Sequence, residues 1–175
     1  MGNKYAKPDP LERARDGDED ALEQVLGGIL APLFDLALHY WRQPVRAELA
    51  TVVGLQGLAR VVRDGGPPDG VSPLAVAVEH LFASTERPPA RTSSPDDLHR
   101  RLGDLEDDRR RAVLAFLACD LDEAELIRAL GRSNARALLD VGLSELDGSE
   151  SEIRQSLDEE AARTALPPGL VDRAL

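Results

Sequence analysis

The residues that could carry out chemistry are few in this chain, and their spacing matches no known catalytic pattern. There is one cysteine, Cys119, and there are three histidines, His39, His80 and His99. A cysteine nucleophile needs a histidine base beside it, and a zinc site is typically marked by cysteines and histidines at short spacings. Neither signal is present, and no phosphate-binding glycine loop or nucleophile elbow occurs. We therefore expect no enzyme active site, no cofactor and no metal, and we expect Cys119 to be a buried core residue.

Clusters of charge are the other candidates for chemistry. The acidic group at residues 104–108 lacks the Asp-x-Asp-x-Asp-Gly pattern of a calcium loop, so we interpret it as a solvated helix start. The arginines of residues 100–101 and 109–111 are the only clusters of positive charge. We expect these arginines to pair with nearby aspartates at helical spacing, and a remnant of a nucleic-acid surface is the alternative.

Composition narrows the class of protein that could position these residues. Hydrophobic residues make up 42% of the 175 residues and aromatic residues only 3%, which favours a helical core of Leu, Val and Ala. The net charge of −11 opposes general binding to nucleic-acid phosphates and favours a protein partner. The single cysteine indicates a reducing compartment. The N-terminus has no apolar secretory core, and the most apolar stretch, residues 29–38, is too short to span a bilayer. We expect a cytoplasmic protein with no membrane contact.

Apolar residues recur at three- and four-residue steps, which predicts an all-α fold. In the first half we expect a helix from Asp18 to Trp41, which Pro32 kinks or divides, a helix over 45–63, and a helix that begins at Pro73 after the cap Ser72. Two glycines inside the second of these helices suggest that another helix approaches it closely. The side chains expected to be buried are Leu22, Val25, Leu26, Ile29, Leu30, Leu33, Phe34, Leu49, Val52, Val53, Leu58, Val62, Leu74, Val78, Leu81 and Phe82.

The second half repeats this pattern with shorter helices. A cap at Ser94 and Pro95 opens the first of them, and Gly131 ends a later one, after which Ser133 or Asn134 caps a helix that runs to about Leu146. One further helix is expected around residues 150–165 of the acidic tail. Whether Leu170, Val171 and Leu175 dock onto the body is open. The side chains expected to be buried are Leu98, Leu102, Leu105, Val113, Phe116, Leu117, Leu121, Leu126, Ile127 and Leu130.

Residues 85–94 are rich in Pro, Ser and Thr and have no apolar period, so we place a domain boundary there. The predicted division is an N-terminal extension at 1–16, a helical domain at 17–84, the linker at 85–94, a second helical domain at 95–147 and an acidic tail at 148–175. The fold expected from this division is two small helical domains joined by a Pro/Ser-rich linker.

Residues 121–146 have the pattern of a helix-turn-helix, with a short helix, a turn at Gly131-Arg132-Ser133 and a second helix. A plain helical hairpin is the alternative. The chain as a whole resembles sigma factors of the small extracytoplasmic-function group, which have a helical region-2 domain, a linker and a region-4 domain that ends in a helix-turn-helix. The resemblance covers residues 17–146. It rests on the segments 17–22 and 31–37 for region 2 and on the segments 102–111 and 122–133 for region 4.

The chain departs from this family at both working surfaces. A region-4 recognition helix presents Lys and Arg to DNA, but Leu138, Asp140 and Leu143 stand where the family usually has basic residues. Seven acids face three bases between residues 120 and 147, a net charge of −4. Residues 48–56 have lost most of the charge with which the family grips RNA polymerase. Residues 59–63 lack the aromatic and basic side chains that would hold a melted promoter.

These departures favour a sigma-factor-like regulator that acts through protein contacts, as a mimic that binds an anti-sigma factor or RNA polymerase. The alternatives are a divergent active sigma factor that directs polymerase to promoters, and a helical adaptor or toxin–antitoxin-type partner. DNA binding is disfavoured by the acidic recognition helix. The candidate contacts with DNA or a partner are Arg132, Asn134, Arg136 and Asp140. Tyr40 and Trp41 are candidate interface anchors, although core filling is the preferred interpretation of both.

Overall fold

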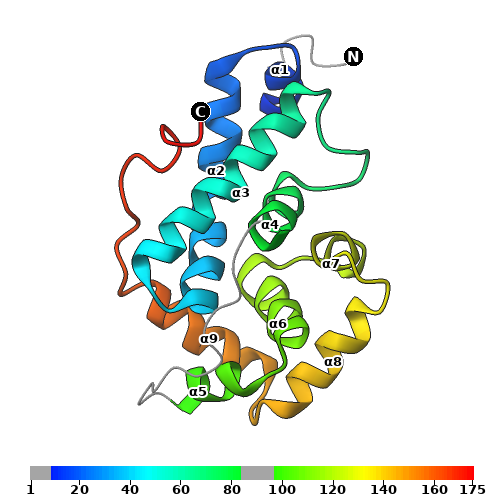
Figure 1. The fold of residues 1–175 in the computed structure, drawn as a ribbon, viewed down its shortest axis with the longest axis vertical. Coiled ribbons are helices and arrows are strands. Elements are labelled where there is room, and N and C mark those ends of the chain that lie inside the picture. Colours follow the sequence, from blue (N-terminus) through cyan, green and yellow to red (C-terminus); the bar gives the residue numbers. More distant parts are fainter. Residues whose placement is uncertain (1–8, 84–96) are drawn as a thin grey trace, which may run out of the picture.

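The computed structural model describes residues 9–83 and 97–175, and over these residues the chain is all-α, with nine helices and no strand (Figure 1). The all-α fold expected from the sequence is therefore confirmed. The helices are α1 Pro10–Arg15, α2 Glu19–Trp41, α3 Pro44–Arg63, α4 Pro73–Ala83, α5 Asp97–Asp104, α6 Asp107–Cys119, α7 Glu123–Leu130, α8 Ala135–Glu145 and α9 Glu150–Ala161.

Helices α2 and α3 form a long hairpin that dominates the first half (Figure 1). The carboxylate of Asp18 caps α2 by accepting a hydrogen bond from the Ala21 N–H at 3.0 Å. Arg42, in a left-handed conformation with φ of 57°, ends α2. Pro32 lies inside α2 and does not open a second helix there, because the helix continues to Trp41.

Helix α4 packs closely on α3 at two glycines, as the sequence suggested. A Cβ at Gly54 would lie 2.9 Å from the Ala77 carbonyl oxygen, and a Cβ at Gly57 would overlap the His80 side chain. Only glycine lets the two helices approach this closely. One prediction for α3 is wrong: Leu49 is 60% exposed, because the buried side of the first turns is formed by the small residues Ala47 and Ala50.

The second half is built on α6, against which α7 and α8 pack. A capping box begins α7, since the Asp122 side chain accepts from the Glu125 N–H while Glu125 accepts from the Asp122 N–H. Gly131 ends α7 with φ of 61°, as predicted, whereas Asn134 precedes α8 without a side-chain cap. Ile127 is 37% exposed and not buried as predicted.

The two halves of the chain share one hydrophobic core. Helix α2 packs on α6, α4 packs on α7, and α9 lies against both α2 and α6 (Figure 1). The predicted division into two domains is therefore not confirmed. The linker at 85–94 and the cap at Ser94 lie outside the described residues, as does the start of the N-terminal extension. Within that extension, residues 10–15 form α1, whose Ala14 is buried.

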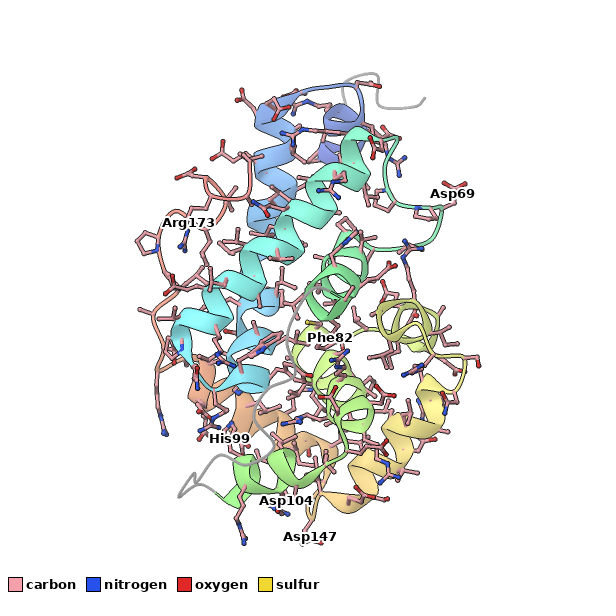
Figure 2. All side chains as sticks on the ribbon, viewed as in Figure 1. Asp69, Phe82, His99, Asp104, Asp147 and Arg173 are labelled. Atoms are coloured by element: carbon pink, nitrogen blue, oxygen red, sulfur yellow. The ribbon has the colours of Figure 1, made fainter. Side chains whose placement is uncertain are left out.

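The tail is folded onto this body. Helix α9 buries Ile153 and Leu157, and beyond it Leu170 is buried as well. Arg173 lies beside α3, where its guanidinium is 3.2 Å from Glu48 Oε2 and its carbonyl accepts from the Gln56 side chain at 3.3 Å (Figure 2). Leu175, in contrast, is 45% exposed.

Helix α2 as a whole is long and apolar enough to cross a membrane by length and composition alone. The helices that surround it bury much of its apolar surface, including Leu26, Leu33 and Leu36, none of which is exposed to solvent. Core helices of globular proteins share this composition, so the helix by itself carries no conclusion about a membrane.

Candidate functional site

The four residues predicted to contact DNA or a partner lie together on the outside of α7 and α8 and the turn between them. Arg132, Asn134, Arg136 and Asp140 are all exposed. Both arginines form ion pairs. Arg132 Nη2 lies 3.1 Å from Asp108 Oδ2, and Arg136 Nε lies 3.0 Å from Asp140 Oδ1, one turn along α8. The structure thus brings the predicted residues to one surface, where each of the two arginines is already neutralised.

The outer side of α8 is short of positive charge. We call it the α8 face and define it by its exposed residues, which are Arg136, Ala137, Asp140, Val141, Ser144 and Glu145. Val141 is 41% exposed, and the single arginine of the face is paired with its single aspartate. Phosphate recognition depends on unpaired Lys and Arg, so this mixed apolar and neutral surface suits a protein better than DNA.

Helix α7 is held by α4 from the other half of the chain. Arg128 Nε lies 3.0 Å from Glu79 Oε2, and the Ser72 N–H donates to Glu125 Oε1 at 3.3 Å. The third arginine of the segment 120–147 is therefore also paired with a carboxylate. These contacts attach α7 to α4 and to the residue that precedes it.

The two candidate interface anchors are core residues. Tyr40 is 1% exposed and Trp41 3% exposed, with their rings in edge-to-face contact at 4.5 Å between centroids. The Tyr40 hydroxyl donates to Asp107 Oδ1 at 2.6 Å and accepts from Arg111 Nε at 3.0 Å. The anchor interpretation is thus corrected, because both rings are buried and Tyr40 contacts α6.

The arginine cluster at 109–111 pairs with neighbouring acids as expected. Arg110 and Arg111 lie 3.5 Å and 3.0 Å from Asp107, at i,i+3 and i,i+4 spacing. Arg109 reaches Glu145 of α8 at 2.6 Å. Through these contacts the arginines of α6 connect this helix to α2 and α8. Carboxylates balance their charges.

Cys119 is buried, as predicted, and its thiol donates to the Pro32 carbonyl at 3.5 Å. Burial, together with the nearby Asp35 carboxylate, raises the pKa of this thiol far above its usual value. Because the thiolate is the reactive form, Cys119 is poorly suited to nucleophilic chemistry.

A buried polar cluster lies where α2, α5 and α9 meet, and the sequence pattern did not indicate it. We call it the His–His–Glu cluster and define it by His39, His99 and Glu160 (Figure 2, where His99 is labelled). His39 Nδ1 lies 3.4 Å from His99 Nε2, which in turn lies 2.7 Å from Glu160 Oε2. The imidazole rings stack with 5.7 Å between their centroids. These are the described residues that could hold a metal ion.

The surroundings of His39 keep its imidazole neutral. Burial lowers the pKa of His39 to about 4, and the positive charge of Arg42 acts in the same direction. A hydrogen bond from the ring to the backbone carbonyl of Leu157 in α9 opposes this shift only partly. At neutral pH, His39 is therefore a neutral side chain with one ring nitrogen available as an acceptor or ligand.

Sequence reasoning missed this cluster because its members have no common spacing. His39 lies near the end of an apolar helix, His99 follows the predicted linker, and Glu160 lies in the acidic tail. The only available signal was that His39 and His99 each fall on an otherwise apolar helix face. That signal is weak, since a lone buried histidine is common.

Comparison with known proteins found no family model, no curated protein and no solved structure that matches this chain.

Proposed function

We propose that this chain is a sigma-factor-like regulator of transcription that acts in the cytoplasm through protein contacts and has no enzymatic activity. Its partner would be an anti-sigma factor or RNA polymerase, which it would occupy as a mimic. The proposal starts from the resemblance of residues 17–146 to small extracytoplasmic-function sigma factors. It treats α7 and α8 as the counterpart of the family's helix-turn-helix.

The observation that favours a protein partner over DNA is the ion pairing of the arginines on α7, on α8 and in the turn between them. Arg128, Arg132 and Arg136 each lie within 3.1 Å of a carboxylate. Phosphate contacts would have to break these pairs in a segment whose net charge is −4, which lowers any gain from DNA. A protein partner has no such requirement and can use Val141 and Ala137 as apolar contacts.

Helix α3 supports the proposal with a second exposed surface. Val45 and Leu49 are one turn apart and are 70% and 60% exposed, which is high for apolar side chains. Leu49 lies in the segment 48–56, which matches the family's polymerase-binding segment but has lost its charge. An exposed apolar pair at this position favours contact with a protein.

Measuring DNA binding at several salt concentrations tests directly whether the partner is a protein or DNA. Fluorescence anisotropy with a labelled duplex of random sequence, at about 50 to 200 mM salt, is expected to give a Kd of about 10⁻⁴ M or weaker at the upper salt concentration. Tight binding that falls steeply with salt would instead favour a divergent active sigma factor.

Two charge-matched variants locate the partner surface. Asp140→Lys makes the α8 face basic, whereas Asp69→Lys makes the same charge change on the exposed α3–α4 connection (Figure 2). We expect Asp140→Lys to weaken capture of the partner from native cells and to strengthen DNA binding relative to Asp69→Lys.

Mass spectrometry of the captured proteins then separates the classes of partner. Polymerase subunits or an anti-sigma factor support the mimic, provided that Asp140→Lys reduces their capture. A single unrelated partner would favour an adaptor or toxin–antitoxin role and would overturn the proposal, as would equal capture by both variants.

A further inference from the structure

Three atoms with lone pairs converge in the interior where α2, α5 and α9 meet. They are His39 Nδ1, His99 Nε2 and Glu160 Oε2, all within 4.8 Å of one another, and each can act as a metal ligand once it carries no proton. Both imidazoles are almost fully buried, with His39 4% and His99 2% exposed. Buried polar atoms this close to one another need a hydrogen or a cation between them.

A metal ion could take the place of the shared hydrogen in this arrangement. A neutral imidazole has one N–H, and the His39 ring uses it for the hydrogen bond to the Leu157 carbonyl, so Nδ1 presents a lone pair to the cluster. The Glu160 carboxylate is also an acceptor. A single N–H on His99 Nε2 would have to serve Nδ1 of His39 at 3.4 Å and Oε2 of Glu160 at 2.7 Å. One cation between the three atoms could be bound by all three.

We propose that His39, His99 and Glu160 bind a divalent transition-metal ion of the zinc class. Zinc–nitrogen bonds of about 2.0–2.1 Å place two ligands of a tetrahedral ion about 3.3 Å apart. The two imidazole nitrogens lie 3.4 Å apart, whereas Glu160 Oε2 lies 2.7 Å from His99 Nε2 and would have to move outward for an ion to fit. Two imidazoles with one carboxylate suit zinc or its neighbours, whereas magnesium takes mainly oxygen ligands. The Glu160 side chain is 30% exposed, so a water from solvent can fill a fourth position.

Groups around the cluster orient its ligands. The Leu157 carbonyl fixes the His39 ring, and Arg42 Nη1, 3.5 Å from Glu160 Oε1, fixes the carboxylate through its other oxygen. Arg42 opposes a cation. The carboxylates of Asp35 in α2 and Asp158 in α9 lie on the same helices as two of the ligands and interact electrostatically with each other.

The ion would cross-link parts of the chain that are distant in sequence. His39 lies in the last turn of α2, His99 lies in α5 at the start of the second half, and Glu160 lies in the tail helix α9. Binding would couple the two halves and the tail, since a ligand that binds only the folded state stabilises it by mass action. This inference does not depend on the proposed sigma-like function.

Zinc titration of the full chain tests the site. After chelator treatment, ZnCl₂ is added to the wild type and to Glu160→Gln, His39→Gln and His80→Gln, while calorimetry and thermal unfolding are followed. His80 is the matched control, because it is the third histidine of the chain and lies on α4, outside the cluster. We expect equimolar binding to the wild type and His80→Gln. At about 100 times the Kd, their Tm should rise by about 5–10 °C.

Glu160→Gln keeps the shape of a partly exposed side chain, so it remains informative if His39→Gln does not fold. We expect Glu160→Gln to bind zinc at least tenfold more weakly, with an unchanged circular dichroism spectrum. Cobalt(II) provides an independent probe, because a site with two nitrogen ligands gives visible absorption that should disappear in the same variants. Equal zinc affinity in Glu160→Gln, or no rise in Tm for the wild type, would overturn the proposal and leave a cluster that shares a proton only.

Discussion

At the scale of single residues, two kinds of glycine have opposite roles in this protein. Gly57 lies against His80 of α4, and a Cβ there would overlap both Cβ and Cγ of that histidine. Gly28 is also inside a helix, but an added Cβ would meet nothing within 4 Å. The first glycine is required by packing, and the second only weakens its helix.

We expect Gly57→Ala to lower the free energy of unfolding by about 1–3 kcal/mol, because α3 and α4 must move apart to fit the methyl group. The matched change Gly28→Ala should raise it by about 0.5–1 kcal/mol, since alanine is the better helix former. Urea unfolding at neutral pH measures both. Equal effects of the two substitutions would contradict the close packing of α3 on α4.

Asp35 gives a prediction with a defined pH dependence. Burial, and then the charge of Asp158, raise the pKa of its carboxyl above the usual value of 3.8. The folded state therefore binds more protons than the unfolded state just above pH 3.8, and its stability falls as the pH rises through the folded-state pKa. Replacing the Asp35 carboxyl with a neutral group should remove this loss of stability.

We expect Asp35→Asn to be more stable than the wild type at pH 7, and the gain to shrink as the pH falls toward 3.8. Urea midpoints across this range measure the effect, with the exposed Glu23→Gln as the control for a general change of charge. A gain that is the same at every pH would contradict the assignment to Asp35 ionisation.

At the scale of elements, α9 is a structural part of the fold although its sequence is acidic. Its capping box, Ser149 with Glu152, begins the helix, and hydrogen bonds from Ser149 hold the pKa of the Glu152 carboxyl below its usual value. Ile153 and Leu157 then form a narrow apolar stripe that packs on α6 and α2. Two leucine-sized contacts on an otherwise polar helix are enough to dock it.

Leu157→Ala should therefore destabilise the whole protein by about 2–4 kcal/mol, because it opens a cavity between α9 and the body. Glu159→Ala, on the exposed side of the same helix, should change stability by less than about 0.5 kcal/mol. Chemical denaturation provides the values, and hydrogen exchange shows whether α9 loses its protection. A tail that is free in solution would show no difference between the variants.

At the scale of the whole molecule, the two halves are joined by polar contacts inside an apolar interface. The Tyr40 hydroxyl of α2 bonds to Asp107 of α6 at 2.6 Å, and the guanidinium of Arg111 lies 5.6 Å from the centre of the tyrosine ring. A shared core with such contacts is expected to unfold as one cooperative unit. Two independent domains would unfold separately.

We expect a single calorimetric transition and a double-mutant coupling of about 0.5–3 kcal/mol between Tyr40→Phe and Asp107→Asn. Glu19→Gln, at the opposite end of α2, serves as the control and should be additive with Tyr40→Phe within about 0.5 kcal/mol. Two resolved transitions, or an additive Tyr40–Asp107 pair, would show that the halves fold independently.

Local patterns account for the part of the fold that was predicted. The helix that begins after Asp18, the cap at Ser72 and the C-cap at Gly131 each depend on residues within one or two turns, and the structure places them as expected. Leu49 and Ile127 were misjudged because a helical period gives the apolar face but not whether another element covers it.

The sequence by itself determined that this protein is helical, acidic and built around a Leu-rich core, because those properties follow from composition and short-range periodicity. Only the tertiary structure decided that the two halves share one core, that Tyr40 and Trp41 are buried and that the charges of Arg132 and Arg136 are balanced. It also decided that His39, His99 and Glu160 meet. Each of these depends on contacts between helices far apart in sequence, for which local spacing carries no signal.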